Sequence, residues 1–301
     1  MQEAKGMIEK YGRAGKIVFE ALQLARREAK PGAKLLELAD KTENFILSQG
    51  ARPAFPVNIS INDVAAHYTP PFDDASVIGE KDVVKIDAGA HVDGFIGDMA
   101  ITLDFSGENG KLVEASERAL EAALSVMKAG ASTSLVGETV ENEIKKFGFK
   151  PIENLTGHAL GEYELHAGIE IPNIKTQHGR ELKEGDVLAV EPFASTGAGH
   201  VSEGNLVEIF SLAEEAPARL RESRKLLTYA QENYKKLPFA ERWLRKSAFP
   251  SKLLLHAALR ELVLMGALHQ YPMLRDSGKG LVSQAELTVL VEKDSVSILT
   301  R

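Results

Sequence analysis

The sequence contains no cysteine, and this absence excludes several kinds of chemistry. A chain without thiols has no disulfide bonds, no cysteine nucleophile and no thiolate-bound zinc. Any metal that the protein binds must therefore be held by carboxylate and imidazole groups.

Long apolar runs and blocks of like charge are also missing. No apolar run approaches the ~18 residues of a membrane-spanning helix, and charges throughout the N-terminal stretch leave no room for a signal peptide. The net charge is −7, with acidic and basic residues interspersed, so no cluster of Lys and Arg suggests a nucleic-acid surface. We expect a cytoplasmic protein that binds neither nucleic acid nor membrane. The 301 residues, 44% of them hydrophobic, suffice for a substantial core.

The most informative stretch is residues 83–100, which predicts a β-hairpin. Two apolar runs flank Asp93-Gly94, a pair that favours a two-residue turn. With that turn, Asp98 lies opposite Gly89, and Asp87 lies one diagonal step away on the same face. Two carboxylates on one face favour a cation between them, and Gly89 is expected to leave room for it. A turn cap and a solvated acid are the alternative, and a one-residue bulge would separate the two side chains.

Helical periodicity lies on both sides of this hairpin. Residues 3–29 and 34–48 predict one helix pair, and residues 108–129 and 135–147 predict another. Residues 54–62 alternate as a half-buried strand does. The expected order is therefore helix pair, strands, helix pair.

An internal repeat links the two halves. Residues 80–87 and 184–191 share the pattern acidic, x, Asp, Val, apolar, x, apolar, acidic, and each places a carboxylate, Asp87 or Glu191, at the end of an apolar strand. We interpret the repeat as a duplicated α/β unit, although a turn into an apolar strand is a common pattern.

The second half of the chain changes character twice. Residues 201–209 predict a strand, and residues 211–270 predict helices alone, at 219–234, 239–246 and 252–266, as in an insertion. Residues 280–291 predict one strand with Glu286 near its start, and 296–299 a short final strand. Acids on buried strands are costly unless they are paired or bound to metal.

These acids and three histidines belong to seven short motifs that follow one another along the chain. The motifs are Ala-Ala-His67-Tyr-Thr-Pro, Ile-Asp87-Ala-Gly, Gly-Asp98-Met, Gly-His158, Leu-His166-Ala-Gly, Val-Glu191-Pro-Phe and Gln-Ala-Glu286-Leu-Thr. Over nearly the whole chain, this series resembles the methionine aminopeptidases. The spacing of 95 positions from Glu191 to Glu286 resembles that of the type 2 branch, and the chain as a whole resembles the short, archaeal-like form of that branch.

The resemblance implies an α/β (α+β) fold, the pseudo-symmetric "pita bread" fold with a curved antiparallel sheet and outer helices. It implies a catalytic domain made of residues 1–207 and 271–301, with a helical insertion at 208–270. Taken alone, each histidine could instead be a structural residue.

The resemblance also implies a dinuclear metal site. Asp87 would bind one divalent ion, His158 and Glu191 the other, and Asp98 and Glu286 both; Co, Mn, Fe or Zn suits such ligands. Two ions ~3.5–4 Å apart lower the pKa of a water molecule, and one can hold a free α-amine.

The remaining expected site residues surround the substrate. Glu191 would move a proton, and His67 and His166 would lie along the peptide, one near the scissile nitrogen and one near the carbonyl oxygen. The implied side-chain pocket, for which core packing is the alternative reading, consists of Phe55, Leu155, Leu165, Phe193 and Tyr271.

The expected activity is removal of the N-terminal methionine from nascent proteins and peptides with a small second residue, by a monomer. One alternative is an Xaa-Pro peptidase of the same fold, although such enzymes place a separate domain before the metal-binding half and only 86 residues precede Asp87 here. Another is a non-catalytic binding protein, although such relatives lose metal ligands and all five are present.

Overall fold

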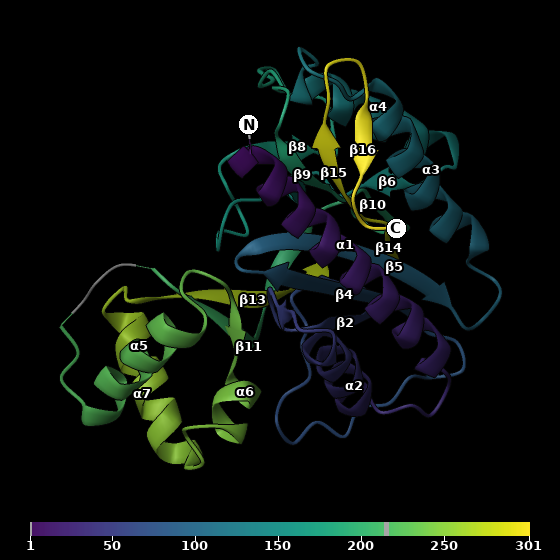
Figure 1. Ribbon diagram of the computed structural model, residues 1–301. Coiled ribbons are helices and arrows are strands. Elements are labelled where there is room, and N and C mark those ends of the chain that lie inside the picture. Colours follow the sequence, from purple (N-terminus) through teal and green to yellow (C-terminus); the bar gives the residue numbers. More distant parts are fainter. Residues whose placement is uncertain (1, 214–216) are drawn as a thin grey trace.

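The computed structural model describes residues 2–213 and 217–301, in which helices cover the outer side of curved antiparallel sheets (Figure 1). The helices are α1 (Gln2–Glu28), α2 (Leu35–Ser48), α3 (Gly110–Val126), α4 (Thr133–Lys146), α5 (Arg221–Asn233), α6 (Glu241–Lys246) and α7 (Lys252–Leu264). The strands are β1 (Arg52–Pro53), β2 (Asn58–Ile61), β3 (Val64–Ala66), β4 (Val83–Val92), β5 (Phe95–Asp104), β6 (Lys150–Pro151), β7 (Thr156–Ala159), β8 (Glu170–Pro172), β9 (Val187–Val190), β10 (Phe193–Ser195), β11 (Val201–Leu212), β12 (Phe239–Ala240), β13 (Leu268–Asp276), β14 (Val282–Gln284), β15 (Leu287–Val291) and β16 (Val296–Ile298).

The β4–β5 hairpin has the predicted turn and register. Asp93 and Gly94 have φ values of 51° and 93°, as a two-residue turn with positive φ at both positions requires. Gly89 pairs with Asp98, and Asp87 pairs with Ala100, without a bulge. The two aspartates therefore share one face of the hairpin.

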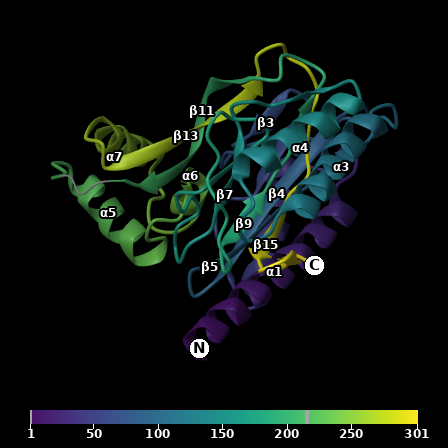
Figure 2. The same cartoon turned by 90° about the horizontal axis from the view of Figure 1, so that it is seen from above.

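The two expected helix pairs cover two halves of the molecule, and Figure 2 shows α1, α3 and α4 on the same side of the strands. Apolar faces of α1 and α2 pack on β2, β4 and β5 in one core, which includes Leu22, Leu38 and Ile86. The faces of α3 and α4 pack on β9 and β15 in a second core, which includes Val140 and Leu188. The sheets thus lie between these helices and the interior cavity described below.

The internal repeat corresponds to two equivalent turns. The side chain of Asp82 accepts a hydrogen bond from Gly79 N (2.7 Å), and that of Asp186 accepts one from Lys183 N (2.8 Å). Each aspartate directly precedes a strand, β4 or β9, that leads to an acid of the repeat. The pattern in the sequence therefore reflects the same local structure in both halves.

The strand expected over residues 280–291 is interrupted, and in this respect the prediction was wrong. β14 pairs with β10 and β15 pairs with β9, and both strand pairs break at the same level, at Ala285–Glu286 and at Glu191–Pro192. Proline has no N–H to donate to a ladder, so a break at Pro192 is expected. The break brings Glu191 and Glu286 to the same bend.

The region expected to contain helices alone also contains strands. β11 extends to Leu212, β13 begins at Leu268, and these two long strands pair with each other. Phe239–Ala240, predicted as the start of a helix, is strand β12 and pairs with β11. The helices α5, α6 and α7 pack around their own apolar cluster, which includes Phe210, Leu226 and Leu259, in the green region of Figure 1.

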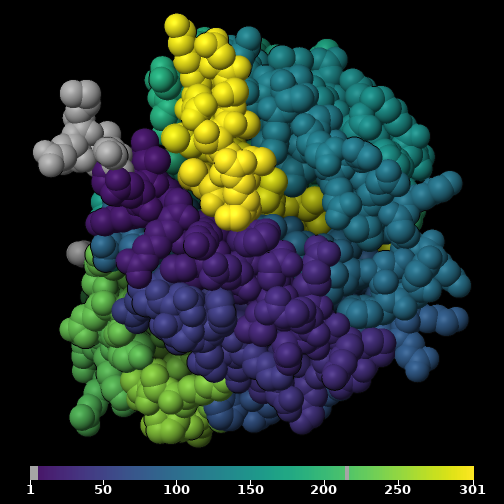
Figure 3. Space-filling view, turned by 45° about the vertical axis from the view of Figure 1, so that its right-hand side comes forward, coloured from purple at the N-terminus to yellow at the C-terminus, as the bar shows by residue number. Residues whose placement is uncertain are grey.

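The first helix and the last strand lie side by side on one face, purple and yellow in Figure 3. Gly15 of α1 allows this approach, because a Cβ atom there would lie 2.2 Å from the carbonyl oxygen of Leu299. Among the described helices, none is both long and apolar enough to cross a membrane.

Candidate metal centre and active site

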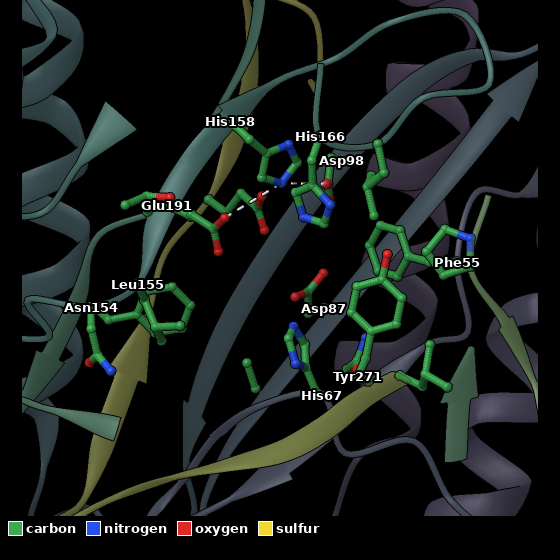
Figure 4. Close-up of a pocket in the computed structure, with 18 residues that line it drawn as sticks. Phe55, His67, Asp87, Asp98, Asn154, Leu155, His158, His166, Glu191 and Tyr271 are labelled. Atoms are coloured by element: carbon green, nitrogen blue, oxygen red, sulfur yellow. Dashed lines mark ion pairs between the residues drawn. The ribbon is translucent and has the colours of Figure 1, made fainter. Parts of the chain in front are cut away.

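One cavity of about 220 Å³ collects every residue that the sequence nominated for the site (Figure 4). These residues come from strands and loops of both halves and from the long strand β13. They are Phe55, His67, Asp87, Asp98, Leu155, His158, Leu165, His166, Glu191, Phe193, Tyr271 and Glu286.

The five expected metal ligands, here called the carboxylate cluster (Asp87, Asp98, His158, Glu191 and Glu286), form the floor of this cavity. Ligand atoms of Asp98, His158 and Glu286 all lie within 4.8 Å of one another. His158 Nε2 is 3.8 Å from Asp98 Oδ2 and 3.6 Å from Glu191 Oε1. Asp87 and Glu191 extend the cluster beyond the compact group of three.

Backbone pairing explains why these side chains meet. Asp87 and Asp98 share a face of the β4–β5 hairpin, and His158 pairs across β7 and β9 with Ala189, two residues before Glu191. Glu286 N donates to Ala100 O (3.2 Å), which joins the bend between β14 and β15 to the hairpin. The cluster therefore depends on contacts between segments far apart in the sequence.

Gly89 does not serve the purpose expected for it. A Cβ atom at Gly89 would lie 2.3 Å from the ring of Phe55, so the space above this glycine is filled by that ring and not by an ion. The prediction that Gly89 leaves room for a metal was wrong. The glycine instead allows Phe55 to pack against the hairpin beside the carboxylates.

The carboxylate cluster brings four acids close together and contains no lysine or arginine. Burial raises the pKa of Asp87 to about 7, and burial followed by the neighbouring carboxylates raises those of Asp98, Glu191 and Glu286 well above their ordinary values. Burial lowers the pKa of His158 to about 3, so its imidazole is neutral.

This electrostatic imbalance fits bound divalent metal. Asp87 Oδ1 and Asp98 Oδ1 are buried without a hydrogen-bond partner among the described residues. Unpartnered buried oxygens and a neutral imidazole are suitable donors for divalent ions of the first transition row, whose charge offsets the repulsion.

Two polar residues that contact or pair with the carboxylate cluster, Gln284 and Asn58, were missed from the sequence. The side-chain amide of Gln284 donates to Asp87 (3.4 Å), Glu191 (3.3 Å) and Glu286 (3.4 Å). Gln284 precedes Glu286 by two positions, so strand alternation could have indicated it. Asn58, which pairs with Asp87 across β2 and β4, could not be placed without that register.

The remaining unpredicted cavity residues are mostly uncharged side chains of the walls. They are Ala66, Asn154, Thr156, Ile209 and Pro238.

The two accessory histidines lie on either side of Asp87 in Figure 4. His67 Nδ1 donates to the carbonyl oxygen of Pro272 (3.2 Å), because a carbonyl can only accept. Burial lowers the pKa of His67 to about 4, so the ring is neutral and its Nε2 is a hydrogen-bond acceptor. His166 packs edge-on against His158, with ring centroids 4.5 Å apart.

Tyr271 forms the wall between these histidines. Its ring contacts His67 edge-on, with centroids 5.6 Å apart, and stacks at 6.4 Å on His166. The Tyr271 hydroxyl is hydrogen-bonded to Ser211 Oγ (3.2 Å), so β11 and β13 together fix this side of the cavity.

Comparison with known proteins matches this chain to a family of metallopeptidases. The sequence profile of Metallopeptidase family M24 matches residues 9–211. A methionine aminopeptidase from Pyrococcus abyssi is 48% identical over 294 residues, which cover 97% of this chain and 99% of that protein.

Two solved structures are similar in fold. A thermophilic Arx1 has a TM-score of 0.87 at 19% identity, covering 98% of this chain and 90% of that one. A methionine aminopeptidase from Thermotoga maritima has a TM-score of 0.72 at 22% identity, covering 98% and 97%. The expected pita-bread fold is thereby confirmed, and the profile match together with the near full-length relative establishes that this chain belongs to metallopeptidase family M24.

Proposed function

We propose that this protein is a metallo-aminopeptidase that removes the N-terminal methionine from proteins and peptides whose second residue is small. The observation that carries this proposal is the carboxylate cluster, whose buried acids meet in a cavity that no lysine or arginine of the described residues lines. The similarity to methionine aminopeptidases over nearly the full length supports the choice of substrate.

We propose that the cluster holds two divalent ions, of Co, Mn, Fe or Zn. Asp87 would bind one, His158 and Glu191 the other, and Asp98 and Glu286 both. When bound, such ions lower the pKa of a water molecule toward neutrality and attract a free amine.

Glu191 is the residue suited to proton transfer. Its carboxylate lies beside His158 and Gln284, and 13% of its side chain is exposed, against 3% for Asp98. Burial, followed by the nearby carboxylates of Asp87 and Asp98, raises the pKa of Glu191, which makes it a better base than an ordinary glutamate. Glu191 would take a proton from the attacking water and return it to the departing amide nitrogen.

The two accessory histidines would divide the contacts to the scissile peptide. Because His67 Nδ1–H is engaged by Pro272 O, its free Nε2 can accept a hydrogen bond from a peptide N–H. His166, on the other side of the cavity, would donate to the carbonyl oxygen, on which negative charge develops.

The apolar part of the cavity suits a methionine side chain. Phe55, Leu155, Leu165 and Phe193 line it, and a flexible thioether adapts to such a wall. We propose that the second residue must pass the segment at His67, which would exclude large side chains.

The wider organisation of the protein remains a proposal of the same kind. Residues 1–207 and 271–301 would form the catalytic domain and residues 208–270 the insertion, although β11 and β13 run across both limits. The substrates are proteins and peptides. We expect a cytoplasmic monomer that acts on nascent chains without nucleic acid or membrane.

The test is to measure kcat/KM of the metal-loaded protein on matched peptides. Met-Ala-Ser should exceed Met-Lys-Ser by at least ~100-fold, because a displacement of about 1 Å at the scissile bond costs that much. Acetyl-Met-Ala-Ser should not be cleaved, since it has no free amine. Comparable values for all three peptides would contradict the proposal. Preference for an Xaa-Pro peptide would favour the proline-specific alternative, and the absence of any cleavage would favour a non-catalytic binding protein.

A further inference from the structure

Lys85 is a buried lysine that no ion pair explains. It lies on β4 with 1% of its surface exposed, and no carboxylate of the described residues is within ion-pair distance of its amine. Burying an amine is costly unless it is hydrogen-bonded, and an apolar side chain of similar length would fill the space at lower cost. The amine is therefore expected to have a role beyond packing.

The amine of Lys85 donates to two backbone carbonyls from distant segments. It lies 2.8 Å from the oxygen of Val282 and 3.2 Å from that of Asn62. Asn62 O also accepts from Val282 N (3.1 Å). Lys85 thus joins the start of β14 to the turn between β2 and β3.

The turn at Asn62 is itself fixed. Its φ of 55° is unusual for a residue other than glycine, and its side chain accepts from Val83 N (2.9 Å) and donates to Asp82 (2.9 Å). A contact made to Asn62 is therefore a contact to a rigid point.

Each segment that Lys85 joins leads directly to the catalytic cavity. The chain runs from Asn62 through β3 to His67, and from Val282 through β14 to Gln284 and Glu286. Lys85 itself is two residues before Asp87, on the same face of β4.

A second contact fastens the same junction. Thr102, which pairs with Lys85 across the hairpin, donates from its hydroxyl to Gln284 O (2.6 Å). Lys85 and Thr102 therefore hold the hairpin to β14 from two adjacent strands.

We propose that Lys85 is a positioning residue of the metal centre, whose amine sets the spacing between Asp87 on β4 and Glu286 beyond β14. The inference rests on the proposed function where activity is measured. Its hydrogen bonds are the essential feature, since they join the segments that bring these carboxylates together.

The absence of cysteine allows the amine to be tested atom by atom. In a Lys85→Cys variant the only thiol of the chain is at position 85. Alkylation of the denatured variant with 2-bromoethylamine creates a side chain of lysine length that ends in an amine. Alkylation with 1-bromopropane creates a side chain of the same length that ends in a methyl group.

Both products are refolded beside wild type taken through the same steps, and folding is checked by circular dichroism. Co²⁺ affinity is measured by calorimetry and visible absorption at temperatures well below the unfolding midpoints. Activity is measured as kcat/KM on Met-Ala-Ser. The amine form should match wild type within about threefold. The propyl form should bind Co²⁺ at least ~10-fold more weakly, which is the usual loss of affinity when a residue that supports a metal ligand is removed. Lys175→Met, which removes an exposed amine paired with Glu138, should leave both values unchanged.

Equal Co²⁺ affinity and visible spectra for the amine and propyl forms would overturn the proposal. If neither form refolds, the same affinity is measured on a Lys85→Met variant that has folded in the cell. Normal Co²⁺ affinity of this variant would overturn the proposal, and weakened affinity would support it. Because Co²⁺ binding requires no substrate, a wild-type protein inactive on methionyl peptides would contradict the proposed function without affecting this test.

Discussion

The carboxylate cluster and a second buried polar group, the arginine cluster of Glu43, Thr69, Arg242 and Trp243, differ in how they balance charge. In the arginine cluster the fully buried guanidinium of Arg242 donates to Glu43 and to Thr69 Oγ1 (2.5 Å), and Trp243 Nε1 donates to the other Glu43 oxygen (2.8 Å). Burial raises the pKa of Glu43, and the guanidinium foremost opposes that rise. The carboxylate of Glu43 is thus paired with a cation of the same chain, although Arg242 Nε has no hydrogen-bond partner among the described residues.

Asp98, His158 and Glu286 of the carboxylate cluster are buried as well, and none of the five members of this cluster is a guanidinium or an ammonium group. The difference indicates what each group is for. The arginine cluster attaches α6 to α2, whereas the carboxylate cluster is completed only by a cation from outside the protein. Substitutions in the arginine cluster should therefore mainly change stability, and substitutions in the carboxylate cluster should mainly change catalysis.

The largest effect is expected from Asp98→Asn. The substitution removes a central ligand while keeping its shape, so catalysis and metal content should fall by more than ~100-fold, beyond the loss typical of supporting residues. The metal-free variant should be at least as stable as wild type at neutral pH, because burial raises the pKa of Asp98 well above its ordinary value and the variant no longer has to take up a proton there on folding. Activity assays, metal analysis and urea unfolding test this, and a fully active variant would contradict the metal centre.

Arg242→Met should have the opposite profile. It leaves Glu43 buried without a cation, which costs about 3–5 kcal/mol of unfolding free energy. Adding Glu43→Gln should recover part of the loss. In urea unfolding, Lys41→Met, which breaks an exposed pair with Glu28, should leave the midpoint almost unchanged, and an equal loss of stability in Arg242→Met and Lys41→Met would refute the distinction.

His166→Ala tests a residue that lies beside the carboxylate cluster and is not one of its members. If His166 stabilises charge on the carbonyl oxygen, the contact strengthens mainly in the transition state. We expect kcat to fall by about 100- to 1,000-fold with little change in KM. Steady-state kinetics on Met-Ala-Ser decides, and a change confined to KM would reject this role.

The smallest effect concerns the pH dependence of the metal-free protein between about pH 6.5 and 8.5. Burial raises the pKa of Asp87 to about 7 and, with the neighbouring carboxylates, raises those of Asp98, Glu191 and Glu286 well above their ordinary values, so folding takes up protons and stability should fall as pH rises. Burial lowers the pKa of Lys85 to about 7, and it also lowers the pKa values of His67 and His158; both effects oppose this trend.

The measurement is the urea midpoint across this range, with and without Co²⁺. Metal should remove the fall, since the carboxylates then stay ionised in the folded state, and Asp98→Asn should reduce it. A midpoint that rises with pH in the metal-free wild type would show that the cluster is not the source of the repulsion.

Local chemistry explains which parts of the fold were predictable. The Asp93-Gly94 turn fixes the whole register of β4 and β5, and the turns at Asp82 and Asp186 recur because their sequence recurs. The ligands came from motifs in a familiar order, and the cavity contains them all. That they carry the proposed roles remains a prediction.

The failures share a physical origin in pairing between distant segments. The bend at Glu286 follows from β14 and β15 pairing with two different strands, and Gln284 and Lys85 depend on the same contacts. Gly89 was misread because the ring that fills its space comes from a loop outside the hairpin. Alternation along one strand indicates a face, but it does not indicate what covers that face.

The bend at Glu286 also has a consequence for the time at which the enzyme becomes active during its synthesis. The β4–β5 hairpin is made early and can form locally, so Asp87 and Asp98 are together long before their partners exist. His158 and Glu191 follow, and the proposed ligand set is complete only after β14 and β15 have been translated and packed. A copy still attached to the ribosome short of that point has no working centre, whatever the supply of metal.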